Sequence, residues 1–255
     1  MTIPAQTPPT ATGVVVLQPD ESRRLLGRAV ARLPQVEKAV QHGRAVVVGG
    51  TTTRFVAWEL TGEDPGLESF AVGWIHQGEL GETPKEGRGA GPLLYEEGNM
   101  SRGWPGSLLE RFQPGDVYIK GANALDPAGN AAILLGSPTG GTIGAAMAIL
   151  MARGGELIMP VSRRKLIPSV TAALGLLGQG KVQHTMGGPV GYFPIPAGSA
   201  TVITEVEAFQ LLFDLQAVQV AAGGVGDSEG ALVFHLSGSS EDMDAAWQFI
   251  TTQRS

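Results

Sequence analysis

The chain has 255 residues, of which 43% are hydrophobic and 16% are charged, and its formal net charge is −6. This length can bury a sizeable core, but the acidic balance lacks the basic footprint of nucleic-acid binding, so no nucleic-acid partner is expected. The absence of cysteine excludes disulfides, a thiol nucleophile and thiolate-held metals, and four scattered histidines argue against any metal site.

The N-terminus is rich in proline and threonine, and it has neither the basic nor the apolar part of a signal peptide. We therefore predict a flexible tail at residues 1–12. The longest apolar stretch, around residues 143–151, is far shorter than the roughly 20 residues that a membrane-spanning helix needs. A cytoplasmic protein without a membrane partner is expected.

Strand and helix patterns alternate along the first two thirds of the chain. The expected strands are residues 13–17 at a sheet edge, 44–50, 70–75, 116–119, 133–135 and 156–160. The expected helices are residues 20–33 with Asp20 as N-cap, 34–42, 54–60, 108–112, 144–153, and 162–174 interrupted by Pro168. Residues 78–106 are expected to be long irregular connections, which often cover functional sites.

This alternation predicts an α/β protein with a Rossmann-like, doubly wound, mainly parallel sheet over residues 13–186. After a Gly- and Pro-rich linker at residues 187–199, the pattern changes to a compact βαββα unit. We predict a small α+β, ferredoxin-like subdomain at residues 200–255, ending in a helix that Ser239 caps.

Gly49, Gly50, Thr51, Thr52 and Thr53 form the first candidate ligand-binding motif, between a strand and a helix. Glycines allow the backbone to approach a ligand, and hydroxyl and N–H groups at a helix N-terminus suit a phosphate or carboxylate. A plain strand-to-helix turn with a threonine cap is an equally good interpretation.

Thr139, Gly140, Gly141 and Thr142 form a second candidate turn before a second helix. If the strands preceding the two turns belong to one sheet, the turns can converge in the crevice beyond the strand ends. The alternative is that these glycines only allow close packing of helix and sheet.

Polar residues after the strands at 116–119 and 156–160 complete the candidate site. A lysine beside two anion-binding turns can hold a ligand charge or, when desolvated, act as a nucleophile. Asp-Pro-Ala-Gly at 126–129 is also an ordinary turn sequence, which favours a structural role for its polar residues. The candidates are Lys120 and Asn123 for catalysis, and Gly121, Asp126, Asn130 and Lys165 for ligand binding.

Three motifs resemble type A ribose-phosphate isomerases, whose superfamily also contains glucosamine-phosphate deaminases and CoA transferases. Gly49-Gly-Thr-Thr-Thr53 stands where the isomerases have a G-T-G-S-T loop. Tyr118-Ile-Lys-Gly-Ala-Asn-Ala124 resembles their Y-V-D-G-A-D-E strand end, and Pro138-Thr-Gly-Gly141 resembles their K-G-G-G turn. The resemblance implies the α/β fold with a small appended α+β subdomain.

The catalytic residues of the isomerases are not retained. Lys120 and Asn123 take the places of the two family aspartates, and the family lysine falls near Pro138 or Thr139. The family's general-base glutamate falls within residues 145–148, which contain no carboxylate. Because an enediolate isomerase needs such a base, the resemblance supports the fold more than the reaction.

We therefore expect the chain to bind a small anionic metabolite, phosphorylated or carboxylated, between the two turns. It is then either an isomerase or transferase acting on that metabolite, or a non-catalytic sensor or assembly protein that kept the fold without the acid–base residues. No cofactor is predicted, and a homo-oligomer is expected from the small apolar subdomain.

Overall fold

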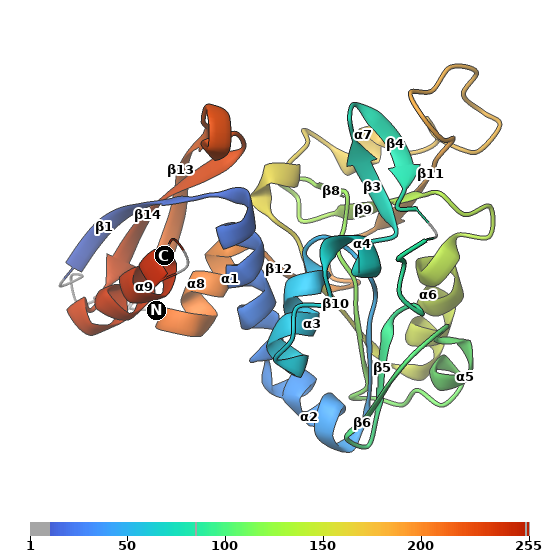
Figure 1. The fold of residues 1–255 in the computed structure, drawn as a ribbon, viewed down its shortest axis with the longest axis horizontal. Coiled ribbons are helices and arrows are strands. Elements are labelled where there is room, and N and C mark those ends of the chain that lie inside the picture. The colour runs from blue at the N-terminus through green and yellow to red at the C-terminus, as the bar shows by residue number, and fades with distance from the viewer. Residues whose placement is uncertain (1–10, 85, 253, 255) are drawn as a thin grey trace, which may run out of the picture.

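A computed structural model describes residues 11–84, 86–252 and 254, and every structural statement below concerns this part of the chain (Figure 1). Residues 1–10 of the predicted tail lie outside it. Ala11 and Thr12, which were assigned to the tail, instead begin strand β1 (Ala11–Leu17).

A six-stranded mixed sheet forms the centre of the larger part of the molecule (Figure 1). In spatial order its strands are β12 (Thr201–Ile203), β10 (Glu156–Pro160), β7 (Val117–Ile119), β2 (Arg44–Val47), β5 (Leu93–Glu96) and β6 (Asn99–Arg102). The first four run parallel, whereas β5 pairs antiparallel with both β2 and β6. The prediction of an α/β protein with parallel strands is confirmed.

Helices cover both faces of this sheet, which explains why its central strands are apolar on both sides. In β7, Val117 and Ile119 face one core and Tyr118 faces the other. The helices are α1 (Pro19–Ala31), α2 (Pro34–His42) and α3 (Thr53–Thr61) on the first face, and α5 (Gly106–Leu109) and α6 (Gly141–Arg153) on the second.

Two helix predictions need correction. The N-cap of α1 is Gln18 rather than Asp20, because Pro19 occupies the first helical position and the Gln18 N–H donates to the Glu21 carboxylate at 2.7 Å. The predicted helix at residues 162–174 is replaced by two short pieces, η1 (Arg163–Lys165) and α7 (Val170–Ala173). Pro168 lies between them, and each piece begins at a serine whose hydroxyl accepts a backbone N–H.

The region predicted as one strand followed by irregular chain contains short elements. Phe70 ends α4 (Leu67–Phe70), so the predicted strand 70–75 is wrong in its first half, and β3 (Gly73–His76) pairs with β4 (Glu79–Glu82). The β3–β4 and β5–β6 hairpins turn at Gln77-Gly78 and Glu97-Gly98, where all four residues have positive φ. Positive φ at both central positions is the backbone of a type I′ hairpin turn.

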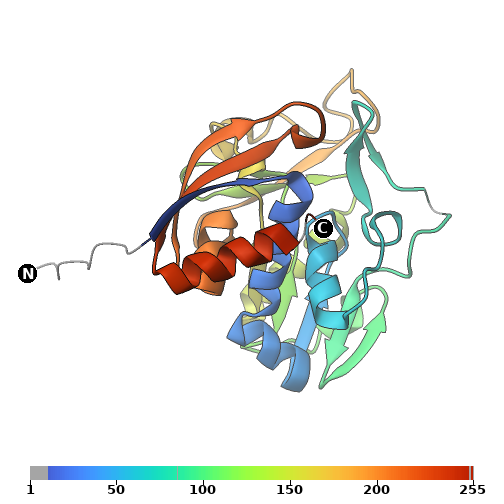
Figure 2. The same cartoon turned by 60° about the vertical axis from the view of Figure 1, so that its left-hand side comes forward.

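A three-stranded antiparallel sheet, ordered β1-β14-β13, forms the smaller part of the molecule (Figure 2). Its strands β13 (Gln216–Gly223) and β14 (Ala231–Gly238) are covered by α8 (Glu205–Phe213) and α9 (Ser240–Thr252), while η2 (Gly226–Ser228) lies between the strands in sequence. The ring of Phe209 in α8 packs against the ring of Phe234 in β14, with 5.8 Å between the ring centroids. Ser239 caps α9 as predicted, accepting the Asp242 N–H at 3.1 Å.

The sheets cross the domain boundaries that were predicted at 13–186 and 200–255. Strand β1, assigned to the first domain, pairs along its whole length with β14, so that Leu17 lies opposite Leu232. Strand β12, assigned to the second domain, pairs with β10 in the main sheet. Each of these strands therefore joins a sheet whose other strands lie on the far side of the predicted boundary.

A second antiparallel sheet, ordered β11-β9-β8, lies beside the β3–β4 hairpin. Its strands are β8 (Ala124–Leu125), β9 (Ala131–Leu135) and β11 (Gly191–Ile195), the last within the predicted linker. Leu80 of the hairpin exchanges backbone hydrogen bonds with Met186 and Gly188 at 2.9 and 2.7 Å. In the described residues, no helix is both long and apolar enough to cross a membrane.

Candidate functional site

Both glycine- and threonine-rich turns line one cavity of about 620 Å³ at the carboxyl ends of β2 and β7. Ligands of open α/β sheets typically bind at this edge. The predicted residues that line the cavity are Gly49, Gly50, Thr51, Thr52, Thr53, Lys120, Gly121, Asn123, Thr139, Gly140, Gly141, Thr142 and Lys165. The second turn follows β9, which belongs to the smaller antiparallel sheet, so the two turns meet without sharing a sheet.

The first turn approaches its neighbours so closely that glycine is required at its start. A Cβ atom on Gly49 would lie 2.0 Å from the Phe70 carbonyl oxygen. The hydroxyl of Thr53 donates to the Val48 carbonyl at 2.6 Å, so this side chain holds the turn itself. Thr51 lines the cavity, and its hydroxyl makes no hydrogen bond to another described residue. The Thr51 hydroxyl is therefore available to a ligand.

The second turn presents the N-terminus of α6 to the same cavity. Gly140 and Gly141 have φ values of +79° and +57°, which glycine adopts without the strain a side chain would add. The first N–H groups of a helix have no acceptor within the helix, and its dipole favours negative charge there. A residue of the main sheet fixes this turn in place, because the hydroxyl of Tyr118 in β7 donates to the Thr142 carbonyl at 2.8 Å.

Lys120 follows β7 directly and lies half-buried in the cavity wall. Its backbone N–H donates to the Ile158 carbonyl at 3.0 Å, which fixes the main chain, and its Nζ donates to Thr142 Oγ1 at 3.2 Å. Burial, with a further contribution from the positive charge of Lys165, lowers the pKa of Lys120 from 10.5 to about 8. Among the described residues, no ion pair involves this lysine.

Lys165 and Asn123 reach the same cavity from η1 and from the chain after β7. Burial, together with the nearby charges of Arg23 and Arg164, lowers the pKa of Lys165 to about 8. Its Nζ donates to the Ala122 carbonyl. The Oδ1 of Asn123 accepts the Leu134 N–H at 3.0 Å, which leaves the Nδ2 group as the part that can donate to a ligand.

Asp126 and Asn130 do not line the cavity. Asp126 Oδ1 accepts the N–H groups of Ala128 and Asn130, both at 3.0 Å, and its Oδ2 accepts the Val170 N–H at 2.9 Å. Burial raises the pKa of this carboxyl, but these hydrogen bonds outweigh burial and hold the pKa below its usual value. Both residues thus serve the turn between β8 and β9 rather than the predicted ligand site.

Several cavity residues were missed by the sequence interpretation because they come from residues 72–104. The β3–β4 hairpin contributes Ile75, Leu80 and Glu82, and Arg88 lies just beyond it. The Arg88 guanidinium lies 3.3 Å from Glu82 Oε2, so these opposite charges offset each other. Lys120 and Lys165 are the lining cations that have no carboxylate at ion-pair distance in the described chain, and the Glu205 carboxylate offsets part of the lowering of the Lys165 pKa. The predicted strand at residues 70–75, which overlaps β3, was a local signal for this wall.

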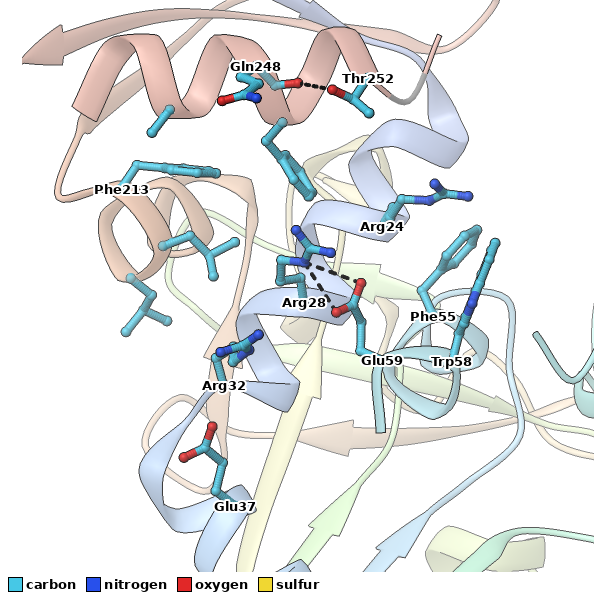
Figure 3. Close-up of a pocket in the computed structure, with 14 residues that line it drawn as sticks. Arg24, Arg28, Arg32, Glu37, Phe55, Trp58, Glu59, Phe213, Gln248 and Thr252 are labelled. Carbon is cyan, nitrogen blue, oxygen red and sulfur yellow. Dashed lines mark hydrogen bonds and ion pairs between the residues drawn. The ribbon is translucent and has the colours of Figure 1, made fainter. Parts of the chain in front are cut away.

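A larger cavity, of about 860 Å³, lies between α1, α3, α8 and α9 (Figure 3). Arg24 and Arg28 of α1 and Arg32, the residue that caps its C-terminus, recur at four-residue spacing on the side that lines this cavity. Arg24 lies 4.5 Å from the Trp58 ring centroid, and Arg28 pairs with Glu59 at 3.2 Å and lies over an aromatic ring of α9. Two of the three guanidinium groups therefore already have partners within the chain.

No three His, Cys, Asp or Glu side chains gather as a metal ion would require within the described ranges. Comparison of the chain with models of known protein families and with curated proteins found no match.

Proposed function

We propose that the cavity at the carboxyl ends of β2 and β7 binds a small metabolite that carries a phosphate or carboxylate group. The observation that carries this proposal is the pair of lysines, Lys120 and Lys165, that line one cavity without a carboxylate partner in the described chain. Burying an unpaired ammonium group costs free energy. An anionic ligand supplies the missing counter-charge, and a purely structural role does not explain why the cost is retained.

The remaining donors of the cavity suit the same ligand class. The N-terminus of α6 faces the cavity through Gly141 and Thr142, and Thr51 adds a hydroxyl from the opposite turn. Val72, Ile133 and Leu135 form an apolar wall. We therefore place the anionic group between the two turns and the carbon skeleton of the metabolite against this wall, in a cavity whose volume is usual for small-molecule sites.

We further propose that the main sheet is Rossmann-like and doubly wound, as in the superfamily of the type A ribose-phosphate isomerases. Helices on both faces and a cavity at the carboxyl ends of parallel strands support this assignment. A cytoplasmic location and a homo-oligomer stay predictions.

The proposed site is compatible with two classes of function. An isomerase or transferase acting on the anionic metabolite is our first candidate, with Lys120 and Asn123 nearest its reacting end. A non-catalytic sensor or assembly protein is the second candidate, and two observations favour it. The first turn of α6 carries no acidic residue, and the lining carboxylate Glu82 is paired with Arg88. Turnover assays on the compounds that bind separate the two.

The binding proposal is tested by thermal unfolding in the presence of inorganic phosphate, pyrophosphate, sugar phosphates and small carboxylates. A ligand that binds only the folded state raises the midpoint, by an amount equivalent to about 2.7 kcal/mol at a hundred times its dissociation constant. We expect phosphorylated compounds to raise the midpoint of the wild type. Because hydrogen bonds to charged groups contribute roughly 1.5–3 kcal/mol, Lys120→Met and Lys165→Met should each weaken affinity about ten- to a hundredfold.

Lys38→Met is the matched control, because Lys38 is exposed on α2 and does not line the cavity. It should keep the affinity of the wild type. Binding of the anions with equal affinity to Lys120→Met and to the wild type, or no binding by any compound of the panel, would refute the proposed site.

A further inference from the structure

The amino group of Lys120 has surroundings that differ from those of a lysine held in an ion pair. Among the described residues its Nζ makes one hydrogen bond, to the neutral Oγ1 of Thr142 at 3.2 Å. Each of the eight ion pairs between described residues uses an arginine, and none uses a lysine. No carboxylate therefore stabilises the charged form of this amine in the protein as described.

Lys165 adds a second positive charge to the same cavity wall. Its own Nζ is held by the Ala122 carbonyl, so this ammonium keeps its position beside the cavity. Two neighbouring ammonium groups repel each other, and desolvation disfavours both charges. Burial and this repulsion lower the pKa of Lys120 to about 8. A desolvated lysine next to another cation is a known arrangement for making an amine nucleophilic at neutral pH.

We propose that Lys120 is a nucleophile that condenses with the carbonyl group of the anionic ligand to form an imine in this cavity. This inference rests on the proposed function, because the anionic group of the ligand brings the carbonyl to the amine. It adds a covalent step to what would otherwise be a site of ionic contacts.

The step balances without a further reactant. The lone pair of the neutral Lys120 Nζ attacks the carbonyl carbon, so that a C–N bond forms and the C=O π bond breaks. One proton then moves from this nitrogen to the oxygen, which gives a carbinolamine. The carbinolamine then loses its hydroxyl group and the remaining amine proton as water, which leaves a C=N bond. When the imine is protonated, it withdraws electrons from the bond next to the former carbonyl carbon.

Neighbouring groups of the cavity suit this step. The Thr142 hydroxyl already contacts the amine, and the Nδ2 group of Asn123 can donate to the oxygen of the carbinolamine. Ile133, which is buried, and Leu135 line the cavity and limit the access of water to the imine. Lys165 remains the cation for the anionic group of the ligand.

Reductive trapping tests the inference. The full-length protein is incubated with sodium cyanoborohydride and either glyceraldehyde 3-phosphate or glyceraldehyde, and the labelled lysines are identified by peptide mass spectrometry. The chain contains five lysines, Lys38, Lys85, Lys120, Lys165 and Lys181, of which Lys38 and Lys181 are exposed and serve as internal references.

At pH 7 we expect Lys120 to be labelled by glyceraldehyde 3-phosphate at least tenfold faster than Lys38 and Lys181. An amine with a pKa of about 8 has roughly 300 times more of its neutral form at this pH than an amine with a pKa of 10.5. Lys165→Met removes the neighbouring charge, so labelling of Lys120 should slow at pH 7 and recover as the pH is raised. A merely structural role of Lys165 predicts no such shift of the pH profile.

The outcomes distinguish this inference from the proposed function. Labelling of Lys120 no faster than that of the exposed lysines refutes the imine, and it leaves the proposed function standing if phosphate compounds still raise the unfolding midpoint. Equal labelling of Lys120 by glyceraldehyde and its phosphate, without protection by inorganic phosphate, supports the nucleophile and refutes the anion site. The comparison of Lys120 with the exposed lysines and the phosphate protection use the wild-type protein, so these two outcomes do not depend on the folding of Lys165→Met.

Discussion

Replacement of Lys120 by methionine should stabilise the unliganded protein at neutral pH. In the folded state the pKa of Lys120 falls from 10.5 to about 8. At about 1.4 kcal/mol for each pH unit, the charged amine costs the folded state roughly 3 kcal/mol. Methionine removes this cost but also the hydrogen bond to Thr142, whose net contribution is about 1 kcal/mol. We expect a net gain of about 2 kcal/mol for Lys120→Met at pH 7.

The gain should depend on pH in a defined direction. Between pH 8 and 10.5 the unfolded wild type holds a proton on Lys120 that the folded protein has largely lost. The free energy of unfolding of the wild type therefore rises with pH across this window, and below pH 8 the full cost remains. Because Lys120→Met lacks this titration, its advantage over the wild type should shrink as the pH rises from 8 to 10.5.

Urea unfolding at pH 7 and pH 10 measures both effects, with Lys38→Met as the control for loss of an exposed lysine. Saturating phosphate should reduce the advantage of Lys120→Met, since the ligand supplies the missing counter-charge in the wild type only. A Lys120→Met protein that is less stable than the wild type at pH 7, or a difference that is the same at both pH values, would show that the ammonium is not held in a costly environment.

Two further changes test the first turn of the cavity and the turn between β8 and β9. Gly49→Ala should lower the free energy of unfolding by about 1–3 kcal/mol, because its Cβ would lie 2.0 Å from the Phe70 carbonyl oxygen. The matched change Gly73→Ala, where nothing lies within 4 Å, should cost much less, and equal urea midpoints for the two variants would contradict this reasoning. Asp126→Asn should be less stable than the wild type at pH 7, because the pKa of the Asp126 carboxyl is lowered from 3.8 in the folded state. That difference should shrink as the pH falls below 3.8, because the wild-type carboxyl then gains a proton and loses its charge. A difference in urea titrations that does not decrease at all between pH 7 and pH 3 would count against it.

Local sequence patterns were sufficient for the elements that carry most of the site. The run after Arg44 and the stretch 156–160 are apolar on both faces, as a strand covered by helices must be, and both are strands of the main sheet. Glycine before threonine at the start of α3 and α6 marked the two turns, because tight turns and helix starts select these residues.

The β3–β4 hairpin, which forms one wall of the cavity, could not be predicted from local sequence patterns. Its strands have four residues each, too few for an alternating pattern to rise above chance. They pair with each other, and Leu80 of β4 also bonds to the distant Met186 and Gly188. The turn at Gln77-Gly78 lacks the Asn or Asp that most often marks a type I′ hairpin. Glu82 and Arg88 therefore could not be placed in the cavity from the sequence.

Sequence alone thus determined the two glycine- and threonine-rich turns and the buried strands β2, β7 and β10, because backbone conformation and solvent exclusion act over a few neighbouring residues. It did not reveal β5 or β11. Only the tertiary structure decided that β1 pairs with β14, and that the turn after β9 meets the turn after β2. The lowered pKa of Lys120 also depends on the tertiary structure. Its residue type is local, but its burial and its position beside Lys165 come from segments 45 residues apart in number (165 − 120) that only the folded chain brings together.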